Sequence, residues 1–288
     1  MSLVMIVSIE NLWIDGPYGR IPVRVYTPAD ESRAGLVWAH GGAFFGGDLD
    51  MPESDWVARQ LADRGITVVA VDYRLAPTLD WATGATGDQA GRFHYPVASE
   101  EVTTAFTWAV SVHPAQRWAI GGASAGGTLT AGAALRLRDN DRPPPAAVLL
   151  AYPLLHAALP ELPAELAAKV ATLPNPELIG AEAVSRMNLN YVRSPETLTA
   201  SYAFPGGHDL TGLPPTFILN ADIDPLRASG QQYGAELAAA GVDLAMIRET
   251  GTSHGHLNEP DNPAATRSVS RMARWLLSLS DATDTDGG

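Results

Sequence analysis

The chain has 288 residues, with 32 acidic against 19 basic side chains, a formal net charge of −13 at pH 7 and no cysteine. Such an acidic chain lacks the basic surface that nucleic-acid binding needs. Without cysteine it can form no thiolate nucleophile, disulfide, iron–sulfur cluster or cysteine-ligated zinc site. Residues 1–10 do not fit a signal peptide and no apolar stretch reaches the ~18 residues of a membrane span, so we expect a cytoplasmic protein.

The predicted elements begin with antiparallel strands over residues 8–28, where partial alternation is broken by turns. Short runs rich in Val and Ile then predict buried strands at Leu36–Ala39, Ile66–Val71, Trp118–Ile120, Ala146–Leu150, Thr216–Leu219 and Leu244–Ile247. Helical periodicity predicts helices at Asp55–Asp63, Glu100–Val112, Ala125–Arg138 and Ala264–Leu279. Strands that alternate with helices are typical of an α/β fold with a mostly parallel sheet and helices on both faces.

Two segments break this alternation. Residues 78–95 are polar and rich in glycine, and residues 156–214 are rich in proline, with helical fragments at Glu161–Thr172 and Ala181–Tyr191. Long excursions in a compact domain usually form lids or binding loops. We therefore expect a single domain over residues 1–280 whose lid or cap elements lie in these two segments, followed by a flexible polar tail at 281–288.

The strongest chemical signal is the sequence GASAG at residues 122–126, between a predicted strand and a predicted helix. A G-x-S-x-G pattern in this context places a serine, here Ser124, on a sharp turn where its hydroxyl can act as a nucleophile. A phosphate-binding loop is the alternative, because Gly121 and Gly126 have the start of the Walker A spacing. That motif needs a lysine where Gly127 stands, so phosphate binding is disfavoured.

A second motif, HGGAF at residues 40–44, directly follows the predicted strand LVWAH. This is the place from which an α/β-hydrolase supplies backbone N–H groups to an oxyanion. The small residues Gly41, Gly42 and Ala43 would let the backbone approach a substrate.

A serine nucleophile needs a base, and the base needs an orienting carboxylate. Asp222 and Asp224 follow one predicted strand, and His254 and His256 follow the last one, so each role has two candidates. Both pairs fall where α/β sheets assemble their sites. The same four side chains could instead hold a metal ion, but this interpretation would leave the serine turn without a role.

Five motifs in this order resemble the hormone-sensitive-lipase-like family of α/β-hydrolase esterases, over about residues 34 to 280: HGGAF at 40–44, DYRLAP at 72–77, GASAGG at 122–127, DPLR at 224–227 and HG at 254–255. The resemblance implies the α/β-hydrolase fold, with a mostly parallel eight-stranded sheet and a reduced cap. It also implies that Ser124 is the nucleophile, Asp224 the orienting acid and His254 the base. By the same resemblance, the oxyanion hole would be formed by Gly42, Ala43 and Ala125, and the supporting motif residues would be His40, Gly41, Gly122 and Gly126.

The chain departs from the family's pattern at several positions. Ala43 stands at the last glycine of the usual HGGG loop, where it restricts φ. Ala123 stands where the family usually has Asp, so we expect the oxyanion loop to lack one support. Thr78 replaces a usual Glu, His256 replaces a usual Phe, and the 78–95 insertion has no counterpart in the pattern.

These observations predict a serine carboxylesterase that hydrolyses neutral, short-acyl esters through an acyl-enzyme, without cofactor or metal. The negative net charge disfavours anionic substrates. An amidase, lactonase or formamide hydrolase would use the same three residues, and a non-catalytic ligand-binding protein on this fold is a more remote alternative. The expected partner is a small-molecule ester, and a homodimer is possible.

Overall fold

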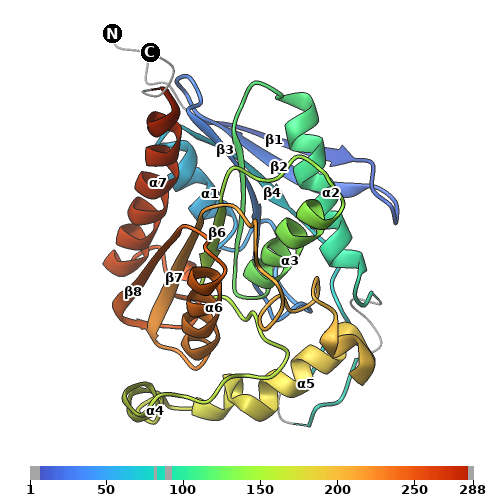
Figure 1. Cartoon of the computed structure of the whole chain (residues 1–288), viewed down its shortest axis with the longest axis vertical. Helices are drawn as coiled ribbons and strands as arrows, with labels where there is room; N and C mark the ends of the chain where they lie inside the picture. The colour runs from blue at the N-terminus through green and yellow to red at the C-terminus, as the bar shows by residue number, and fades with distance from the viewer. Residues whose placement is uncertain (1–6, 81–82, 88–92, 285–288) are drawn as a thin grey trace.

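The computed structural model describes residues 7–80, 83–87 and 93–284, and these residues form an eight-stranded sheet at the centre of the molecule (Figure 1). The strands are β1 (Ser8–Ile14), β2 (Ile21–Thr27), β3 (Ala34–Ala39), β4 (Ile66–Val71), β5 (Trp118–Ala123), β6 (Val148–Ala151), β7 (Thr216–Ile223) and β8 (Leu244–Ser253). They lie in the order β1-β2-β4-β3-β5-β6-β7-β8. Strand β2 is antiparallel to both β1 and β4, and all pairs from β4 to β8 are parallel, so the predicted mostly parallel sheet is confirmed.

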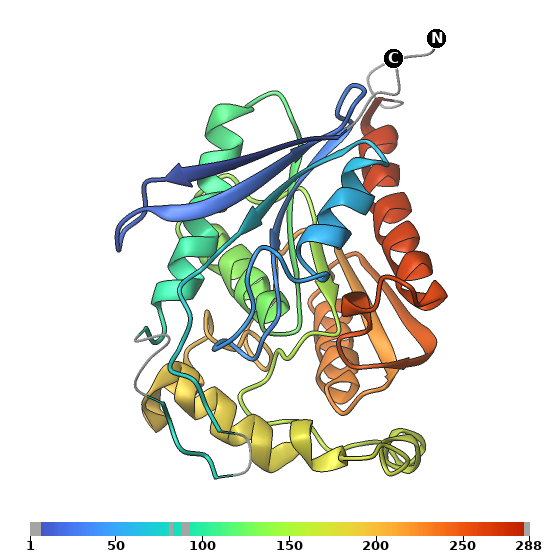
Figure 2. The ribbon, with the colours of Figure 1, turned by 180° about the vertical axis from the view of Figure 1, so that it is seen from behind.

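The α-helices of the described residues lie on both faces of the sheet and at the carboxyl ends of its parallel strands. They are α1 (Asp55–Ala62), α2 (Val97–Val112), α3 (Ala125–Asp139), α4 (Ala164–Val170), α5 (Ala181–Val192), α6 (Arg227–Ala239) and α7 (Pro263–Asp284). Helices α2, α3 and α6 lie on one face, and α1 and α7 lie on the other, which is nearest the viewer in Figure 2. Among the described residues, none of the helices combines the length and the hydropathy that crossing a bilayer would need.

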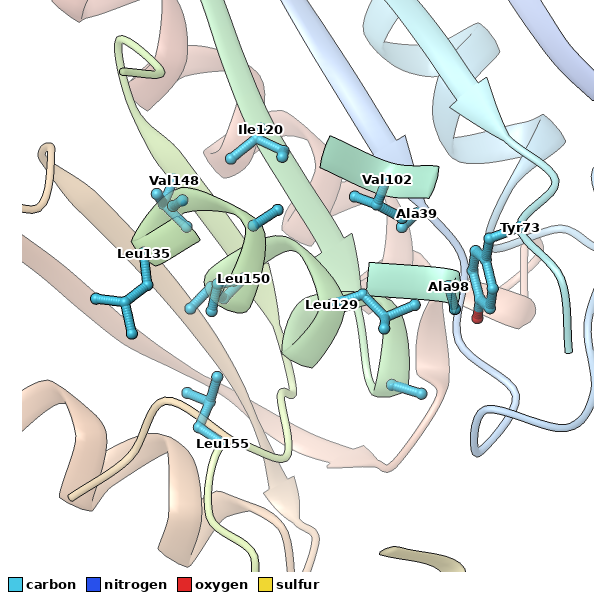
Figure 3. Packing of buried hydrophobic residues seen from close by; sticks show 14 of the residues in the cluster. Ala39, Tyr73, Ala98, Val102, Ile120, Leu129, Leu135, Val148, Leu150 and Leu155 are labelled. Atoms are coloured by element: carbon cyan, nitrogen blue, oxygen red, sulfur yellow. The ribbon is translucent and has the colours of Figure 1, made fainter. Parts of the chain in front are cut away.

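The alternation of side chains along the strands separates two hydrophobic cores. Ile120 of β5 and Val148 of β6 contribute to the core beneath α2 and α3, where Leu135 of α3 also lies (Figure 3). Their neighbours in the chain, Ala119 and Leu149, contribute to the opposite core beneath α1 and α7. Because successive strand residues point to opposite faces, both faces of these central strands are buried. Full burial of each large apolar side chain stabilises the fold by about 1.5–3 kcal/mol.

Helix α6 was not expected from the sequence. Its buried face is made largely of small residues, and it shows no repeating stripe of large apolar side chains. Gly230 lies so close to Asn220 of β7 that a Cβ atom would stand 2.1 Å from the Asn220 side-chain oxygen. A helix that packs through small residues has a weak amphipathic pattern, which explains why periodicity did not indicate it.

Helix α7 begins near the expected residue and continues to Asp284, past the expected end at Leu279. No glycine or proline stands between these two residues to end it. The first half of the expected flexible tail, 281–288, is therefore helical, and residues 285–288 lie outside the described part of the chain.

The two excursions lie together at the carboxyl ends of the parallel strands, where α4 and α5 are seen below the sheet in Figure 1. The side-chain amide of Asn190 in α5 donates to the carbonyl of Pro77 at 2.7 Å, and the Tyr95 N–H donates to the Tyr191 carbonyl at 2.9 Å. Residues 81–82 and 88–92 of the 78–95 segment lie outside the described residues. A cap formed by 78–95 and 156–214, and a single domain over 1–280, stay predictions.

Candidate active site

Ser124 stands on a sharp turn between β5 and α3. Its backbone has φ 51° and ψ −121°, in a region that non-glycine residues rarely adopt and that carries strain. The turn is possible because Gly122 and Gly126 lie against neighbouring backbone. A Cβ atom on Gly126 would stand 2.1 Å from the Ala39 carbonyl oxygen, and one on Gly122 would stand 2.5 Å from the Gly126 backbone. Close approach to β3 therefore requires both glycines.

A continuous hydrogen-bonded chain runs from this serine to a buried carboxylate. Ser124 Oγ lies 2.9 Å from His254 Nε2, and His254 Nδ1 lies 2.8 Å from Asp224 Oδ2. The Asp224 side chain is completely buried, and its Oδ1 accepts the Leu226 N–H at 2.9 Å, which fixes the carboxylate. Donation from Nδ1 to Asp224 leaves Nε2 to accept the serine hydroxyl.

The structure separates the members of each candidate pair. Asp222 does not face His254, because its carboxylate accepts from Lys169 Nζ at 2.7 Å and from the Gly251 N–H at 3.0 Å. His256 Nε2 lies 2.9 Å from Ser268 Oγ. Asp224 and His254 are therefore the acid and the imidazole that reach Ser124, and the four side chains do not converge as a ligand set. Among the described residues, no three His, Asp or Glu side chains are grouped as a metal site would require.

The electrostatics of the site keep His254 basic. Burial lowers the pKa of His254, but the Asp224 carboxylate, with a smaller contribution from Glu53, outweighs burial and raises this pKa above its ordinary value. A carboxylate beside an imidazole favours the charged form. The charged form of His254 is thereby stabilised.

This raised pKa predicts the pH dependence of activity. Only neutral His254 can accept the serine proton, so kcat/KM for a neutral ester is expected to rise with pH through the pKa of His254. Because this pKa is raised, the half-maximal value should lie above about pH 6.5. Initial rates from about pH 5 to 9 measure it, and a midpoint at or below about pH 6.5 would contradict the assignment of His254.

The HGGAF loop after β3 has an unusual backbone. Gly42, Ala43 and Phe44 have φ of 112°, 57° and 68°. Gly42 must be glycine, because a Cβ atom there would stand 2.1 Å from the Gly46 carbonyl oxygen. Ala43 adopts the left-handed region despite its methyl group, at a cost of about 1 kcal/mol relative to glycine. The side chain at this position, which we expected to restrict φ, therefore makes the loop backbone strained.

Backbone donors are available beside Ser124. Within the described residues, the N–H groups of Gly42 and Ala43 donate to no other backbone group. Ala125 directly follows the serine and begins α3, so its N–H lies at the positive end of the helix dipole. These three donors are of the kind that stabilises a developing oxyanion.

His40 stabilises the start of the same loop through a hydrogen bond and ring stacking. It is fully buried, its Nδ1 lies 2.7 Å from the Gly41 carbonyl oxygen, and its ring stacks on Tyr73 with centroids 4.4 Å apart. The Tyr73 hydroxyl donates to the His40 carbonyl at 2.8 Å. The first residues of the loop are thus held against Tyr73, which stands just after the end of β4.

A pocket of about 380 Å³ opens at Ser124 and His254. Its apolar lining comes from the oxyanion loop and the residues that follow it, from the excursion 156–214 and from the residue before α6. The larger apolar side chains are Phe45, Met51, Ile179, Met187 and Leu226. A larger groove of about 530 Å³ lies between α2 and α3 beside Arg136, but it contains none of the predicted site residues. The candidate site is therefore identified by the residues that line the smaller pocket and not by the volume of the pocket.

Comparisons with known proteins agree with this geometry. A family model described as the alpha/beta hydrolase fold matches residues 36–258. The chain belongs to the α/β-hydrolase family. It is 36% identical over 280 residues to "Esterase LipI" of Mycobacterium tuberculosis, covering 91% of this chain and 79% of that protein. It is 34% identical over 249 residues to "Carboxylesterase NlhH" of the same species, covering 83% and 72%.

A solved esterase from Pyrobaculum calidifontis superposes on this α/β-hydrolase with a TM-score of 0.82 at 30% identity, covering 96% of this chain and 84% of that one. The metagenomic carboxylesterase EstE1 gives a TM-score of 0.81 at 26% identity, covering 95% and 90%. The predicted fold class and the resemblance to esterases of this family are confirmed.

Sequence reasoning missed one residue of this α/β-hydrolase's site, Glu53. It is 1% exposed, lines the pocket, and accepts the Gly41 N–H at 2.6 Å. Ala123 has no carboxylate to support the oxyanion loop, and the Glu53 carboxylate holds the Gly41 N–H of this loop from another segment of the chain. Glu53 stands in the polar stretch MPESD, where nothing in the pattern distinguishes it from a surface carboxylate.

Proposed function

We propose that the chain is a serine carboxylesterase in which Ser124 attacks the ester carbonyl and His254 accepts its proton. The observation that carries the proposal is the hydrogen-bonded chain from Ser124 through His254 to Asp224 at the mouth of an apolar pocket. His254 then donates this proton to the departing alkoxide, which leaves an acyl-enzyme. A water molecule then attacks the acyl carbonyl as His254 takes its proton, and when the bond to Ser124 Oγ breaks, His254 returns this proton to Oγ, which releases the carboxylic acid and regenerates the hydroxyl.

The lining of the pocket supports a neutral substrate with a short acyl group. Among the described residues that line it, Glu53 and His254 are the only ionisable side chains besides the serine, and none is a lysine or arginine that could bind a carboxylate. A volume of about 380 Å³ is at the small end of the range for ligand pockets. An anionic substrate would also meet the net charge of −13.

Met187 of α5 is expected to limit the length of the acyl group, because its side chain is one of the larger apolar groups that line the pocket. Met187→Ala should raise kcat/KM for longer acyl chains relative to acetate by about tenfold, since a few methylene groups gain room. A series of p-nitrophenyl esters from acetate to decanoate measures the ratio. Leu189→Ala is the matched control, because Leu189 lies on the same helix but outside this pocket. An unchanged chain-length profile in Met187→Ala would argue against this boundary.

Ester and amide analogues of one acyl group distinguish the carboxylesterase from its nearest alternatives. The expected result is cleavage of the ester with much the higher kcat/KM. A preference for the amide, or for a lactone, would assign the same three residues to a different bond. A cytoplasmic location belongs to the proposal as well, and recovery of the activity mainly from the medium or the cell envelope would contradict it.

A further inference from the structure

Glu53 lies where three segments of the site meet. Its Oε1 accepts the Gly41 N–H at 2.6 Å, and its Oε2 accepts from the Tyr152 hydroxyl and from the Asn258 side-chain amide, the latter at 3.3 Å. Its own N–H donates to Asn258 Oδ1 at 3.1 Å, and its carbonyl accepts the Trp38 indole N–H at 2.9 Å. Glu53 thus joins the oxyanion loop to the end of β6 and to the segment that follows β8.

The peptide group between His40 and Gly41 is held at both ends. Its carbonyl accepts the Tyr73 hydroxyl at 2.8 Å, and its N–H donates to Glu53 at 2.6 Å. The next residue, Gly42, turns the chain with φ 112° and begins the run of backbone donors. Fixing this peptide plane therefore fixes the direction from which Gly42 and Ala43 present their N–H groups.

We propose that Glu53 is a positioning residue for the oxyanion hole, which it holds in place through the Gly41 N–H. This inference rests on the proposed esterase function. Glu53 takes the supporting part that the Asp usual in the family at position 123 would play, and it does so from a different segment of the chain. No atom of Glu53 needs to touch the reacting carbonyl.

The contacts of Glu53 suit a carboxylate and not an amide. All three of its side-chain partners, Gly41, Tyr152 and Asn258, are donors, and an ionised carboxylate is acceptor-only. Burial raises the pKa of Glu53 above its ordinary value, and the bonds from Tyr152 and Gly41 and the nearby His254 oppose part of this rise. A buried charge is costly unless hydrogen-bonded, and these donors offset the cost.

Glu53 also acts on His254 through its charge. The titratable groups around His254 in the described part of the chain are Asp224, Glu53, Tyr152, whose ring centroid lies 5.1 Å from that of His254, and His256, whose ring lies 5.3 Å from the same Tyr152 ring. Both carboxylates raise the pKa of His254. Removing the charge of Glu53 should therefore lower this pKa, which a purely structural role would not do.

The test is Glu53→Gln in the full-length chain, which keeps the shape but places an NH₂ group among donors. We expect kcat on a short-acyl ester to fall about 100-fold, as when one oxyanion donor is lost, with KM within about threefold of wild type. Affinity for a boronic-acid transition-state analogue should fall in parallel. The acid limb of the kcat/KM profile should move to lower pH.

Glu249→Gln is the matched control. Glu249 is a buried carboxylate on β8, 3.0 Å from Arg267 Nε and outside the pocket, so its variant should keep the wild-type kcat and pH profile. A wild-type enzyme without esterase activity would defeat the proposed function itself. An active wild type together with a Glu53→Gln variant of unchanged kcat and pH limb would overturn only the role of Glu53.

If circular dichroism shows that Glu53→Gln does not fold, Tyr152→Phe decides the question. This variant keeps the ring beside His254 and removes one donor to Glu53. We expect a loss of about three- to tenfold in kcat with unchanged KM, corresponding to one hydrogen bond. Wild-type kcat in a folded Tyr152→Phe would overturn the inference.

Discussion

Replacing Ser124 with alanine is expected to lower kcat on a short-acyl ester by about 10³-fold or more. The hydroxyl that His254 activates at 2.9 Å would be lost, while the pocket and the backbone donors would remain. Residual turnover would then reflect only binding and oxyanion stabilisation. Steady-state kinetics with p-nitrophenyl acetate measure the loss, and KM should change little because the hydroxyl is not required for binding.

The chain contains its own control for this experiment. Ser229 Oγ lies 2.8 Å from His156 Nδ1, and His156 Nε2 lies 3.2 Å from Glu236 Oε1, so a second serine, histidine and carboxylate are linked. Ser229 is fully buried and its oxygen already accepts the Leu155 N–H at 2.8 Å. Ser229→Ala is therefore expected to keep the wild-type kcat, at a cost of about 1–3 kcal/mol in the free energy of unfolding.

A fluorophosphonate probe separates the two serines directly. Mass spectrometry should find the label on Ser124 in the wild type and in Ser229→Ala, and no label in Ser124→Ala. Label on another residue, or unchanged kcat in Ser124→Ala, would refute the proposed mechanism. Both serines have a histidine within hydrogen-bond distance. The expected difference in labelling therefore depends on the strained turn at Ser124 and on access, because Ser124 lines a pocket and Ser229 is fully buried.

The sharp turn at Ser124 could be predicted from the sequence because its requirements are local. The glycines on either side of Ser124 and the strand and helix that flank them stand within a few residues of one another. The acid and the base could not be chosen in this way. The two candidate acids stand two residues apart at the end of one strand, and the two candidate histidines stand two residues apart after another strand. Which member reaches Ser124 is decided by partners elsewhere in the chain, such as Lys169 for Asp222 and Ser268 for His256.

Apolar periodicity indicated the centres of the strands but not their carboxyl ends. Strand β7 continues to Ile223 and β8 to Ser253, beyond the predicted ends at Leu219 and Ile247. The added residues are mostly polar, yet the parallel ladder continues through Asn220 paired with Arg248. In this fold the site is built at those ends, so hydrophobic patterning ends just where the functional residues begin.

Glu53 shows the limit of pattern reading most clearly. Its partners Gly41, Tyr152 and Asn258 lie at distances along the chain that no motif links. The absence of an acid at position 123 suggested a missing support, and only the packing of the segment before α1 reveals what holds the loop instead. A side chain that stabilises a loop from a distant part of the sequence produces no local sequence pattern.

Asp224→Asn is expected to reduce kcat by about 10³-fold or more, while Asp222→Asn should leave it within about threefold of wild type. At position 224 the carboxylate accepts from His254 Nδ1 at 2.8 Å. In the Asp224→Asn side chain, the amide oxygen would keep the bond from the Leu226 N–H, and the NH₂ group would then face His254 Nδ1. Because Nδ1 would have to accept from this NH₂ group, the imidazole proton would move to Nε2. Nε2 could then no longer accept the proton of Ser124, and the imidazolium would lose its counter-charge.

Asp222→Asn is a demanding control, because the two carboxylates stand two residues apart and both are buried. Asp222 holds α4 to the sheet through Lys169 Nζ at 2.7 Å and also pairs with Arg248 Nε of β8 at 3.3 Å, so its loss should lower the free energy of unfolding by about 1–3 kcal/mol. Thermal melts and kcat, measured on both variants well below the lower melting temperature, separate stability from catalysis. Loss of kcat in Asp222→Asn with retention in Asp224→Asn would transfer the orienting role to Asp222, against the 2.8 Å contact between Asp224 and His254.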